Sequence, residues 1–301
     1  QAESEIAAIN MVLGASSAGV RAMTSSSSPG ISLKTEGISY IAGSDVPALI
    51  INVQRGGPGL GGIQPSQADY WQATKATGHG DFQILVFAPS TVQEMVDFVS
   101  LAFDLGDKYR MPAMILADGM LGQMMEPVEF KDQGENAKID KPWALTGHQF
   151  KRPHNVVNSL YLKPADLERL VKERFERYET IKKTEQRAEE YLVDDADIVV
   201  VAYGASSRVA RSAVNAARAE GIKAGLIRPI TLWPFPTDAL QRAAQHVKKF
   251  LAVEMSMGQM VDDVRLAIHD QKPVEFYGRT GGMITTPAEV LGAVKKAGGV
   301  L

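Results

Sequence analysis

The sequence predicts an α/β protein built from two units, each a parallel β-sheet covered by helices. Short runs rich in Val, Ile and Leu alternate along the chain with helix-like segments, as in successive βαβ units. These runs are apolar throughout, which is typical of strands buried on both faces. The length of 301 residues exceeds one domain of ordinary size. We therefore expect two α/β units.

The first unit opens with a helix-like segment over residues 5–18, which is apolar on nearly every side and predicts a buried, closely packed helix. A short strand over residues 20–24 follows and breaks into the serine-rich segment 25–30. The run Ala48–Val53 predicts the next strand, which ends at the glycine-rich loop of Arg55.

A third strand is expected over residues 83–88, followed by an amphipathic helix that reaches Leu105. Ser90 or Thr91 can cap this helix, and Glu94 can complete a capping box.

A fourth strand, over residues 111–117, ends at Asp118. Four loop-like segments therefore follow strands: the serine-rich segment, the Arg55 loop, a turn at Pro89 and the loop at Asp118. The carboxyl ends of parallel strands meet at one edge of a sheet, and sites form there. We expect the functional site at this edge.

The second half of the chain begins irregularly over residues 130–163. Residues 165–191 then form a strongly charged helical stretch, which we interpret as a solvated linker or surface helix. We therefore divide the chain into a first domain over 1–163, a helical linker over 164–192 and a second domain over 193–301. In the second domain we expect strands over 197–202, 224–228 and 249–253, a turn over 204–207, and helices over 208–220 and 260–268.

Composition excludes several classes of protein. The 32 basic and 35 acidic side chains nearly balance, at a net charge of -3, which argues against binding to nucleic acid or an anionic membrane by bulk charge. Cysteine is absent, so this chain has no disulfide, no thiol nucleophile and no ligands for an iron–sulfur cluster. No apolar run is long enough to span a bilayer. We expect a soluble, cytoplasmic protein.

The Arg55 loop is the strongest candidate for a binding site. Five glycines lie between residues 56 and 62, and glycine allows the backbone to approach a ligand closely. The planar guanidinium of Arg55 matches a carboxylate or a phosphate with two hydrogen bonds. The pattern indicates an anion site, although a flexible surface loop with a solvated arginine fits the composition equally well.

Other motifs are weaker. The Arg55 loop lacks the Lys-Ser or Lys-Thr of a phosphate-binding Walker loop and the glycine spacing of a dinucleotide site. The serines at 25–28 have no matched His and Asp, which disfavours a hydrolase. His79 lies between two glycines and could reach a substrate, whereas the other histidines show no metal-ligand spacing, so we expect no metal site on this chain.

Glu5 is a second candidate. An acid that opens an apolar helix loses water when the helix is buried, and it can then hold or deliver a proton near neutral pH. The alternative is that Glu3 and Glu5 only complement the positive end of the helix dipole.

Several longer motifs resemble the α subunits of 2-oxoacid:ferredoxin oxidoreductases, most of all the 2-oxoisovalerate (3-methyl-2-oxobutanoate) branch. The similarity extends over essentially the whole chain. The motifs are Ser4-Glu5, Thr24–Gly30, Asn52–Gly59, Gln64–Asp69 and Gly78–Asp81, followed by Asp118–Pro127, Arg152–Asn155, Ile227–Pro234 and Val253–Gln259.

The resemblance implies a pyrimidine-type thiamine-diphosphate-binding three-layer domain followed by a transketolase C-terminal-like domain. It implies oxidative decarboxylation of a 2-oxoacid with thiamine diphosphate, formation of an acyl-CoA from coenzyme A, and electron transfer to ferredoxin. A β subunit would hold the diphosphate and Mg²⁺, and [4Fe-4S] clusters would lie on partner subunits, including ferredoxin-like γ and δ subunits. The absence of cysteine agrees with that division.

The resemblance also assigns roles to residues. Glu5 corresponds to the glutamate that pairs with N1′ of the aminopyrimidine, and Arg55 to the arginine that binds the substrate carboxylate. The segments around them would line the cofactor cavity; the residues we expect there are Ser27, Ser28, Pro29, Gly30, Gly56 and Gly57.

Two questions stay open at this point. A Tyr-Pro-Ile-Thr-Pro-like segment lies before the Ser-Glu motif in the family and is absent here, so we expect a further N-terminal segment that is either truncated or disordered. The substrate could be a branched-chain 2-oxoacid, 2-oxoglutarate or pyruvate, and a different class of function would be a non-catalytic scaffold in a redox complex.

Overall fold

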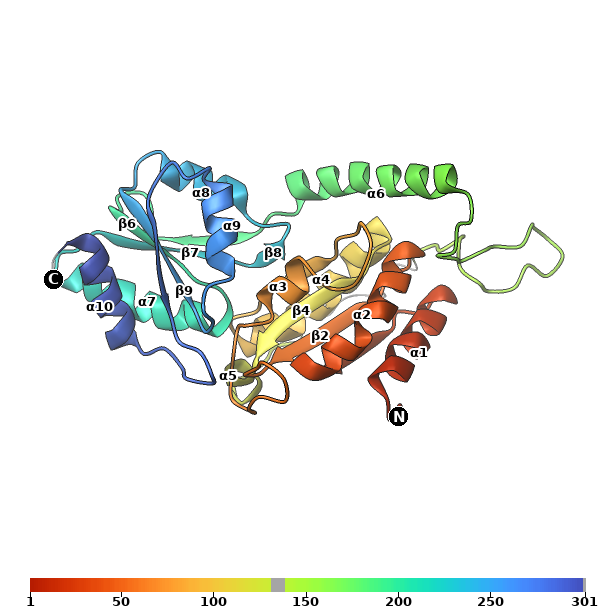
Figure 1. The fold of residues 1–301 in the computed structure, drawn as a ribbon, viewed down its shortest axis with the longest axis horizontal. Coiled ribbons are helices and arrows are strands. Elements are labelled where there is room, and N and C mark those ends of the chain that lie inside the picture. Colours follow the sequence, from red (N-terminus) through yellow and green to blue (C-terminus); the bar gives the residue numbers. More distant parts are fainter. Residues whose placement is uncertain (131–138, 300–301) are drawn as a thin grey trace.

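The computed structural model describes residues 1–130 and 139–299. It contains two five-stranded sheets with helices packed on them (Figure 1). Four strands of the first sheet come from the N-terminal half, the second sheet lies within the C-terminal part, and the long helix α6 (Pro164–Thr184) lies between these two regions along the chain (Figure 1).

The first sheet has the strand order β1-β2-β4-β3-β8. Its first four strands are parallel, whereas the last strand, β8, pairs antiparallel with β3 and comes from the C-terminal part of the chain. The sheet therefore draws on both halves of the sequence. Its strands are β1 (Met23–Ser26), β2 (Leu49–Gln54), β3 (Leu85–Phe87), β4 (Ala113–Asp118) and β8 (Thr231–Trp233).

We expected the serine-rich segment to be a loop, and this prediction is wrong. Its first residues belong to β1, and Ser28 already begins the helix α2 (Ser28–Gly43). Pro29 explains the change, because proline in the first turn of a helix has a backbone angle suited to a helix start and needs no hydrogen-bond partner for an N–H. The expected capped helix is α4 (Val92–Tyr109), which runs beyond Leu105.

The cap of α4 is formed by Thr91, one of the two candidates. The backbone N–H of Glu94 donates to Oγ1 of Thr91 at 3.1 Å. The carboxylate of Glu94 in turn accepts from the backbone N–H of Ser90 at 2.8 Å. Both contacts satisfy backbone donors that a helix start leaves unpaired.

The first helix, α1 (Glu5–Ser17), is not buried on all sides. Ile9 and Val12 are buried, but Ile6 is 51% and Met11 is 62% exposed. The physical reason is that α1 packs chiefly against α2 and, to a smaller extent, against β1, which leaves the side with Ile6 and Met11 open. An apolar helix surface left open in this way is typical of a subunit interface.

The charged helix α6 differs from its prediction in two ways. It ends at Thr184, and residues 188–191 form the strand β5 instead, because their backbone pairs antiparallel with β7. It is also not fully solvated. Arg174 is buried and donates to Asp45 of the first unit from Nε at 3.0 Å, so the helix is fastened to that unit.

The second sheet has the order β10-β9-β6-β7-β5, with β5 alone antiparallel to its neighbour. The expected turn at 204–207 is instead the first turn of α7, which begins at Gly204. The strands are β5 (Ala188–Tyr191), β6 (Ile198–Val201), β7 (Ala224–Pro229), β9 (Lys249–Glu254) and β10 (Val274–Gly278). The remaining helices are α3 (Tyr70–Thr74), α5 (Gly119–Gly122), α7 (Gly204–Ala219), α8 (Thr237–Ala244), α9 (Met260–Ala267) and α10 (Pro287–Gly298).

The two units are joined by the buried side chain of Gln67. Its Nε2 donates to the carbonyl oxygen of Tyr203 at 2.9 Å, and its Oε1 accepts from Oγ of Ser206 at 2.7 Å and from the backbone N–H of Met255 at 3.0 Å. A buried amide with these contacts holds the carboxyl ends of β6 and β9 against the first unit.

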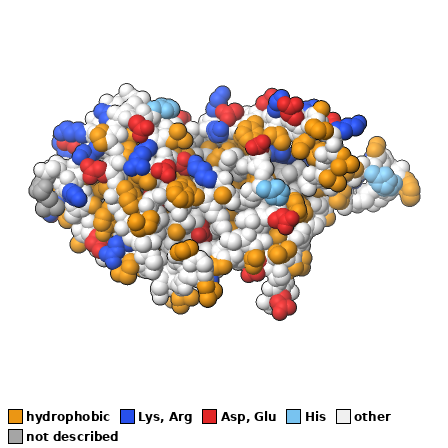
Figure 2. All heavy atoms as spheres, in the orientation of Figure 1, with side chains coloured by type: hydrophobic (Ala, Val, Ile, Leu, Met, Phe, Trp, Pro, Cys, Tyr) orange, Lys and Arg blue, Asp and Glu red, His pale blue; other side chains and the backbone are white. Residues whose placement is uncertain are grey.

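The surface mixes charged and hydrophobic side chains (Figure 2). A loop after residue 139 projects beyond the first unit (Figure 1), and hydrophobic and histidine side chains lie at its end (Figure 2). Among the helices of residues 1–130 and 139–299, none has the length and apolarity to cross a bilayer.

Candidate active site

The start of α2 is the point at which the expected site residues meet. Glu5, in the first turn of α1, extends its side chain over Gly30, so that a Cβ at position 30 would come within 3.0 Å of Oε1. The same Cβ would collide with Oγ of Ser26 at the end of β1. A larger residue at position 30 would require the side chains of Ser26 and Glu5 to move, so Glu5 lies packed against Gly30 beside the end of the first strand.

A second glycine keeps α1 in position. A Cβ on Gly37 would overlap the side chain of Ile9, whose Cγ1 would lie 2.8 Å away. Ile9 is buried, and it is one helical turn beyond Glu5 on the same face of α1. Close contact between α1 and α2 thus places Glu5 through the packing of Ile9.

Ser28 connects this helix start to Arg55. Its Oγ accepts from the backbone N–H of Arg55 at 3.1 Å and donates to Oδ2 of Asp69 at 2.5 Å. Ser27 is the N-cap residue of α2 in extended conformation, and its side chain makes no capping hydrogen bond. Ser27, Ser28, Pro29 and Gly30 therefore all lie within the first turn between Glu5 and the end of β2.

The Arg55 loop is closed on itself. Arg55 forms a β-bridge with Pro65, and the N–H of Gly56 donates to the carbonyl oxygen of Gln64 at 2.9 Å. Gly56 also lies close to the backbone of Gly281 and Gly282 from the second unit, whereas the Cβ position of Gly57 is open. The loop is thus held at both ends rather than freely flexible.

The guanidinium of Arg55 has capacity for a ligand. Its Nη2 makes one long contact of 3.4 Å, to the carbonyl oxygen of Leu60. Its Nε is buried and has no hydrogen-bond partner. Because a buried donor without a partner is costly, an oxygen anion that accepts from this side of the guanidinium fits the observation.

Sequence reasoning gave no role to three residues near Glu5 and Arg55, namely Asn52, Asp69 and Lys34. Asn52 is fully buried and donates from Nδ2 to Oδ2 of Asp69 at 2.9 Å, while its Oδ1 has no partner. The signal was present, since a polar residue within an apolar strand needs a reason to be buried. The third is Lys34 of α2, which is only 1% exposed.

The ammonium of Lys34 is bound to the first strand, β1. Its Nζ donates to Oγ1 of Thr24 at 2.8 Å and to the carbonyl oxygen of Ser25 at 3.1 Å. Burial lowers the pKa of the Lys34 ammonium below its ordinary value, and the charge of the nearby Glu5 opposes part of that shift. An ammonium is therefore placed where the first strand, α2 and Glu5 meet.

Asp118 has a structural role at the same edge of the sheet. Its Oδ1 caps α5 by accepting from the backbone N–H groups of Met120 and Leu121, and burial raises its pKa. In the described residues no group of three His, Asp or Glu side chains could hold a metal ion.

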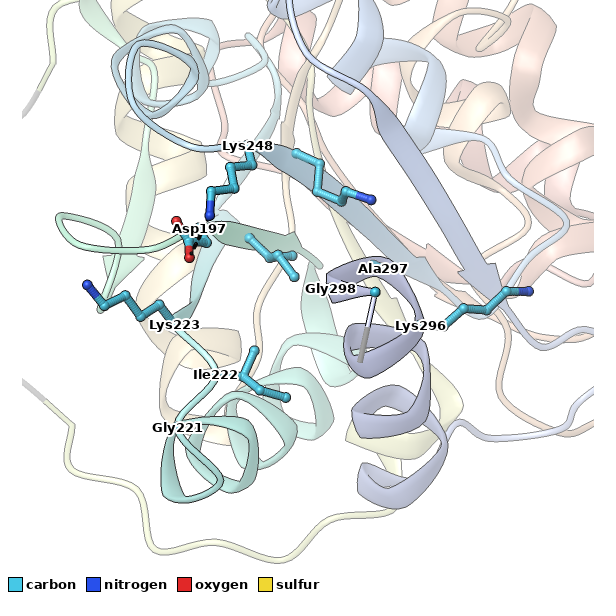
Figure 3. Close-up of a pocket in the computed structure, with 11 residues that line it drawn as sticks. Asp197, Gly221, Ile222, Lys223, Lys248, Lys296, Ala297 and Gly298 are labelled. Atoms are coloured by element: carbon cyan, nitrogen blue, oxygen red, sulfur yellow. Dashed lines mark ion pairs between the residues drawn. The ribbon is translucent and has the colours of Figure 1, made fainter. Parts of the chain in front are cut away.

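Two other features lie away from this edge. His79 packs against Tyr40 with ring centroids 6.2 Å apart, beside the C-terminal half of α2, and so does not join Glu5 and Arg55. The hollow in Figure 3 lies in the second unit beside the C-terminal end of α10. There Lys248 points to Asp197, at 3.2 Å, while Lys223 and Lys296 point away from each other, so the lysines do not converge on one ligand.

Two α/β units, with Glu5 over the start of α2 and Arg55 after β2, give the chain a transketolase-like α/β fold. The fold agrees: a split-gene transketolase matches 98% of this chain and 81% of its own, with a TM-score of 0.58 at 15% identity. The expected fold class is confirmed.

Sequence comparison narrows the class to one family. Residues 1–193 match the family model of the thiamine-diphosphate-binding domain of pyruvate flavodoxin/ferredoxin oxidoreductases, and residues 196–290 match the core domain II of pyruvate:ferredoxin oxidoreductase. The chain belongs to the 2-oxoacid:ferredoxin oxidoreductase family, as its motifs predicted.

Named relatives lie in the same family. Ketoisovalerate oxidoreductase subunit VorB of Methanothermobacter thermautotrophicus is 51% identical over 99% of this chain and 84% of its own length. The 2-oxoglutarate synthase subunit KorA of Methanothermobacter marburgensis is 35% identical over 98% of this chain and 85% of its own.

A solved relative is the 2-oxoglutarate:ferredoxin oxidoreductase of Magnetococcus marinus, with 2-oxoglutarate, coenzyme A and succinyl-CoA bound. It is 26% identical with a TM-score of 0.80, and the match covers 98% of this chain. The present chain spans 56% of that solved chain.

Proposed function

We propose that this chain is the α subunit of a thiamine-diphosphate-dependent 2-oxoacid:ferredoxin oxidoreductase that acts on branched-chain 2-oxoacids. With partner subunits it would convert the 2-oxoacid and coenzyme A to acyl-CoA and CO₂ and pass electrons to ferredoxin. The 51% identity to a ketoisovalerate oxidoreductase subunit over nearly the whole chain supports a branched-chain substrate. The buried, unpaired Nε of Arg55 supports a binding site for the substrate carboxylate.

The residues present fit thiamine diphosphate as half of a shared site. Glu5 would hold the aminopyrimidine ring through N1′, and the first turn of α2, from Ser27 to Gly30, would form the wall behind it. Glu5 is half-buried on this chain alone. A second chain over the open side of α1 would complete its removal from water.

When bound, thiamine diphosphate supplies a nucleophilic carbon and an electron sink for decarboxylation. The work of Glu5 is to share a proton with the ring through its carboxylate, at a position fixed by Gly30 and Ile9. Arg55 binds the carboxylate of the 2-oxoacid through Nε and a terminal nitrogen, which orients the keto group toward the cofactor. Ser28 holds the backbone of Arg55 while this happens.

The other cofactors belong to partner subunits in this proposal. The chain has no cysteine, so [4Fe-4S] clusters need another polypeptide, such as ferredoxin-like γ and δ subunits. Asp118 caps a helix with its Oδ1, which supports placing Mg²⁺ and the diphosphate on a β subunit. The open apolar side of α1, with Ile6 and Met11 exposed, is a surface such a subunit could cover.

The test is an initial-rate panel with the assembled complex, coenzyme A and a ferredoxin as acceptor. 3-Methyl-2-oxobutanoate should give the highest kcat/KM, above 2-oxoglutarate and pyruvate. A preference for 2-oxoglutarate would favour the alternative to which the 35% identical KorA relatives point. Normal turnover in both the Glu5→Gln and Arg55→Ala complexes would instead support a scaffold subunit.

A further inference from the structure

Asp69 occupies the N-cap position of the short helix α3, yet its side chain does not cap that helix. An aspartate at an N-cap ordinarily accepts from a backbone N–H in the first helical turn. Here the N–H of Trp71, the second residue of α3, donates instead to Oε1 of Gln259 from the second unit, at 2.8 Å. The carboxylate of Asp69 is therefore not needed for capping and makes other contacts.

One oxygen of this carboxylate joins α2 to β2. Oδ2 of Asp69 accepts from Oγ of Ser28 at 2.5 Å and from Nδ2 of Asn52 at 2.9 Å. The backbone N–H of Asp69 donates to Oε1 of Gln54, the last residue of β2, at 3.1 Å. Asn52 and Gln54 are two residues apart and so lie on the same face of the sheet. Asp69 is thus fixed on β2 immediately before Arg55.

The proton of the Ser28 hydroxyl has two acceptors within reach. Oδ2 of Asp69 lies 2.5 Å from Oγ, and the carbonyl oxygen of Arg55 lies 3.3 Å from it. A hydroxyl turns to suit its partners, and a carboxylate is a stronger acceptor than a carbonyl oxygen. The proton therefore points to Asp69. The lone pairs of Oγ remain for the backbone N–H of Arg55, which donates at 3.1 Å.

This arrangement holds Arg55 without occupying its guanidinium. Within residues 1–130 and 139–299, no ion pair joins Arg55 to an acid, and its Nε has no hydrogen-bond partner. A direct pair between Asp69 and the guanidinium would fill the fork that matches a carboxylate. Contact through Ser28 and the backbone instead leaves the charge of Arg55 available to an anion.

We propose that Asp69 is a positioning residue for Arg55: it binds the hydroxyl of Ser28 and thereby fixes the backbone from which the guanidinium reaches the carboxylate of the 2-oxoacid. This inference rests on the proposed role of Arg55 in substrate binding. The fully buried Asn52 belongs to the same network, and its Oδ1 has no partner. Because an apolar residue would be buried in this strand without that penalty, stability alone does not explain the network.

The experiment is steady-state kinetics of the assembled complex with the preferred 2-oxoacid. Asp69→Ala removes the acceptor of the Ser28 proton and should raise the KM for the 2-oxoacid about tenfold, with a smaller change in kcat. That is less than the roughly hundredfold loss for a group misplaced by about 1 Å, because Ser28 can still accept from Arg55. The KM for coenzyme A and the dissociation constant of thiamine diphosphate should stay within about twofold, since the change acts at the substrate carboxylate.

The conservative variant Asp69→Asn provides a partial rescue. It keeps an oxygen that can accept from both Ser28 and Asn52, but a neutral carbonyl is a weaker acceptor than a carboxylate. We expect a rise of about threefold in the KM for the 2-oxoacid. Asp69→Asn also serves as the second variant if the complex with Asp69→Ala does not assemble.

A double-mutant cycle with Ser28→Ala tests the route of the effect. Ser28→Ala removes the hydroxyl through which Asp69 acts on Arg55. In this background, Asp69→Ala or Asp69→Asn should cause no further rise in the KM for the 2-oxoacid. If the effects of the two substitutions multiply, Asp69 does not act through Ser28 and the proposal is wrong.

Thermal unfolding of the same complexes separates positioning from a loss of stability, with Tyr109→Phe as the matched control. This control also removes a hydrogen bond from a hydroxyl to a carboxylate, the one to Glu185 at 2.6 Å. Tyr109 ends α4 at the amino end of β4, whereas Arg55 follows the carboxyl end of the parallel strand β2. Tyr109→Phe should lower the unfolding temperature and leave the KM unchanged. A rise in KM equal to that of Asp69→Ala would mean that reduced stability is the cause.

Failure of this inference is distinguishable from failure of the proposed function. If Arg55→Ala leaves the KM for the 2-oxoacid unchanged, the proposed role of Arg55 is wrong and Asp69 has nothing to position. If Arg55→Ala raises that KM but neither variant of Asp69 does, the role of Asp69 alone is overturned.

Discussion

The side chain of Glu5 lies directly over Gly30, where an added Cβ would come within 3.0 Å of Oε1 and 3.1 Å of Cγ. Two successive helices of the chain thus meet through one acid and one missing side chain. The position of the acid depends on a residue that has no chemistry of its own.

Gly30→Ala should therefore abolish most of the activity. The new methyl group would collide with Oγ of Ser26 and displace Glu5. We expect kcat/KM of the assembled complex to fall by at least a hundredfold, in line with the loss from misplacing a catalytic group by about 1 Å. Steady-state kinetics with saturating thiamine diphosphate is the measurement.

Gly292→Ala is the matched control for Gly30→Ala. Gly292 lies inside α10, and a Cβ there would meet nothing within 4 Å. Alanine should leave kinetics unchanged and stabilise the helix by about 0.5–1 kcal/mol. Equal losses of activity in both variants would mean that Glu5 is not held by Gly30.

The contact between Ile9 and Gly37 should be a coupled pair. Gly37→Ala would force its methyl group into Ile9 and separate α1 from α2, and overpacking of this kind costs about 1–3 kcal/mol. Ile9→Ala alone removes a buried side chain and should cost about 2–5 kcal/mol. In the double variant the space left by Ile9 accommodates the new methyl group. In chemical denaturation, the double variant should lose less unfolding free energy than the sum of the two single losses. Strict additivity would show that the residues do not touch.

Most central strands could be predicted from the sequence, because a continuous apolar run such as that of β4 indicates a buried strand whatever it pairs with. The start of α2 was misinterpreted, since four serines resemble a loop until Pro29 is recognised as a residue of the first helical turn. β5 and β8 depend on pairing with distant strands, β7 and β3, which no local pattern encodes.

The candidate site divides in the same way. Glu5 and Arg55 stand out by position, one at a helix start and one at a strand end, and the pattern around them is local. Lys34 resembles any surface lysine in a helix, because its burial arises only when α1 packs across Gly30 and Gly37. Burial of this kind depends on tertiary packing and is invisible to sequence patterns for this reason.

Arg55→Lys should separate charge from geometry in substrate binding. Lysine keeps the positive charge but cannot offer two parallel hydrogen bonds, and its ammonium cannot replace the buried Nε. We expect kcat/KM for the 2-oxoacid to fall about tenfold in Arg55→Lys and a hundredfold or more in Arg55→Ala. The dissociation constant of thiamine diphosphate should stay within twofold in both. A fall in cofactor affinity, with the KM for the 2-oxoacid unchanged, would place the guanidinium on the cofactor instead.

Glu185, which follows α6, should make part of the stability depend on pH. Burial acts to raise its pKa, but hydrogen bonds from the hydroxyl of Tyr109 at 2.6 Å and from Lys108 at 3.0 Å outweigh burial and hold the pKa below its ordinary value of 4.5. A carboxyl group with a lowered pKa stabilises the folded state above that ordinary value, and the contribution is lost as the pH falls through the folded value.

Tyr109→Phe removes the shorter of these two hydrogen bonds without changing the volume of the buried ring. At pH 7 the variant should lose about 2 kcal/mol of unfolding free energy, the usual worth of a hydrogen bond to a buried charge. The difference from the natural protein should shrink as the pH falls below 4.5, because a protonated Glu185 no longer gains from the contact.

Urea denaturation at pH 7, 5 and 3.5 measures the trend. Tyr161→Phe, whose hydroxyl donates to the nearby carbonyl oxygen of Asn158, is the control and should show no such pH dependence. A loss for Tyr109→Phe that is constant over this range would mean that the hydroxyl stabilises the fold through Thr184, its other neighbour, rather than through the charge of Glu185.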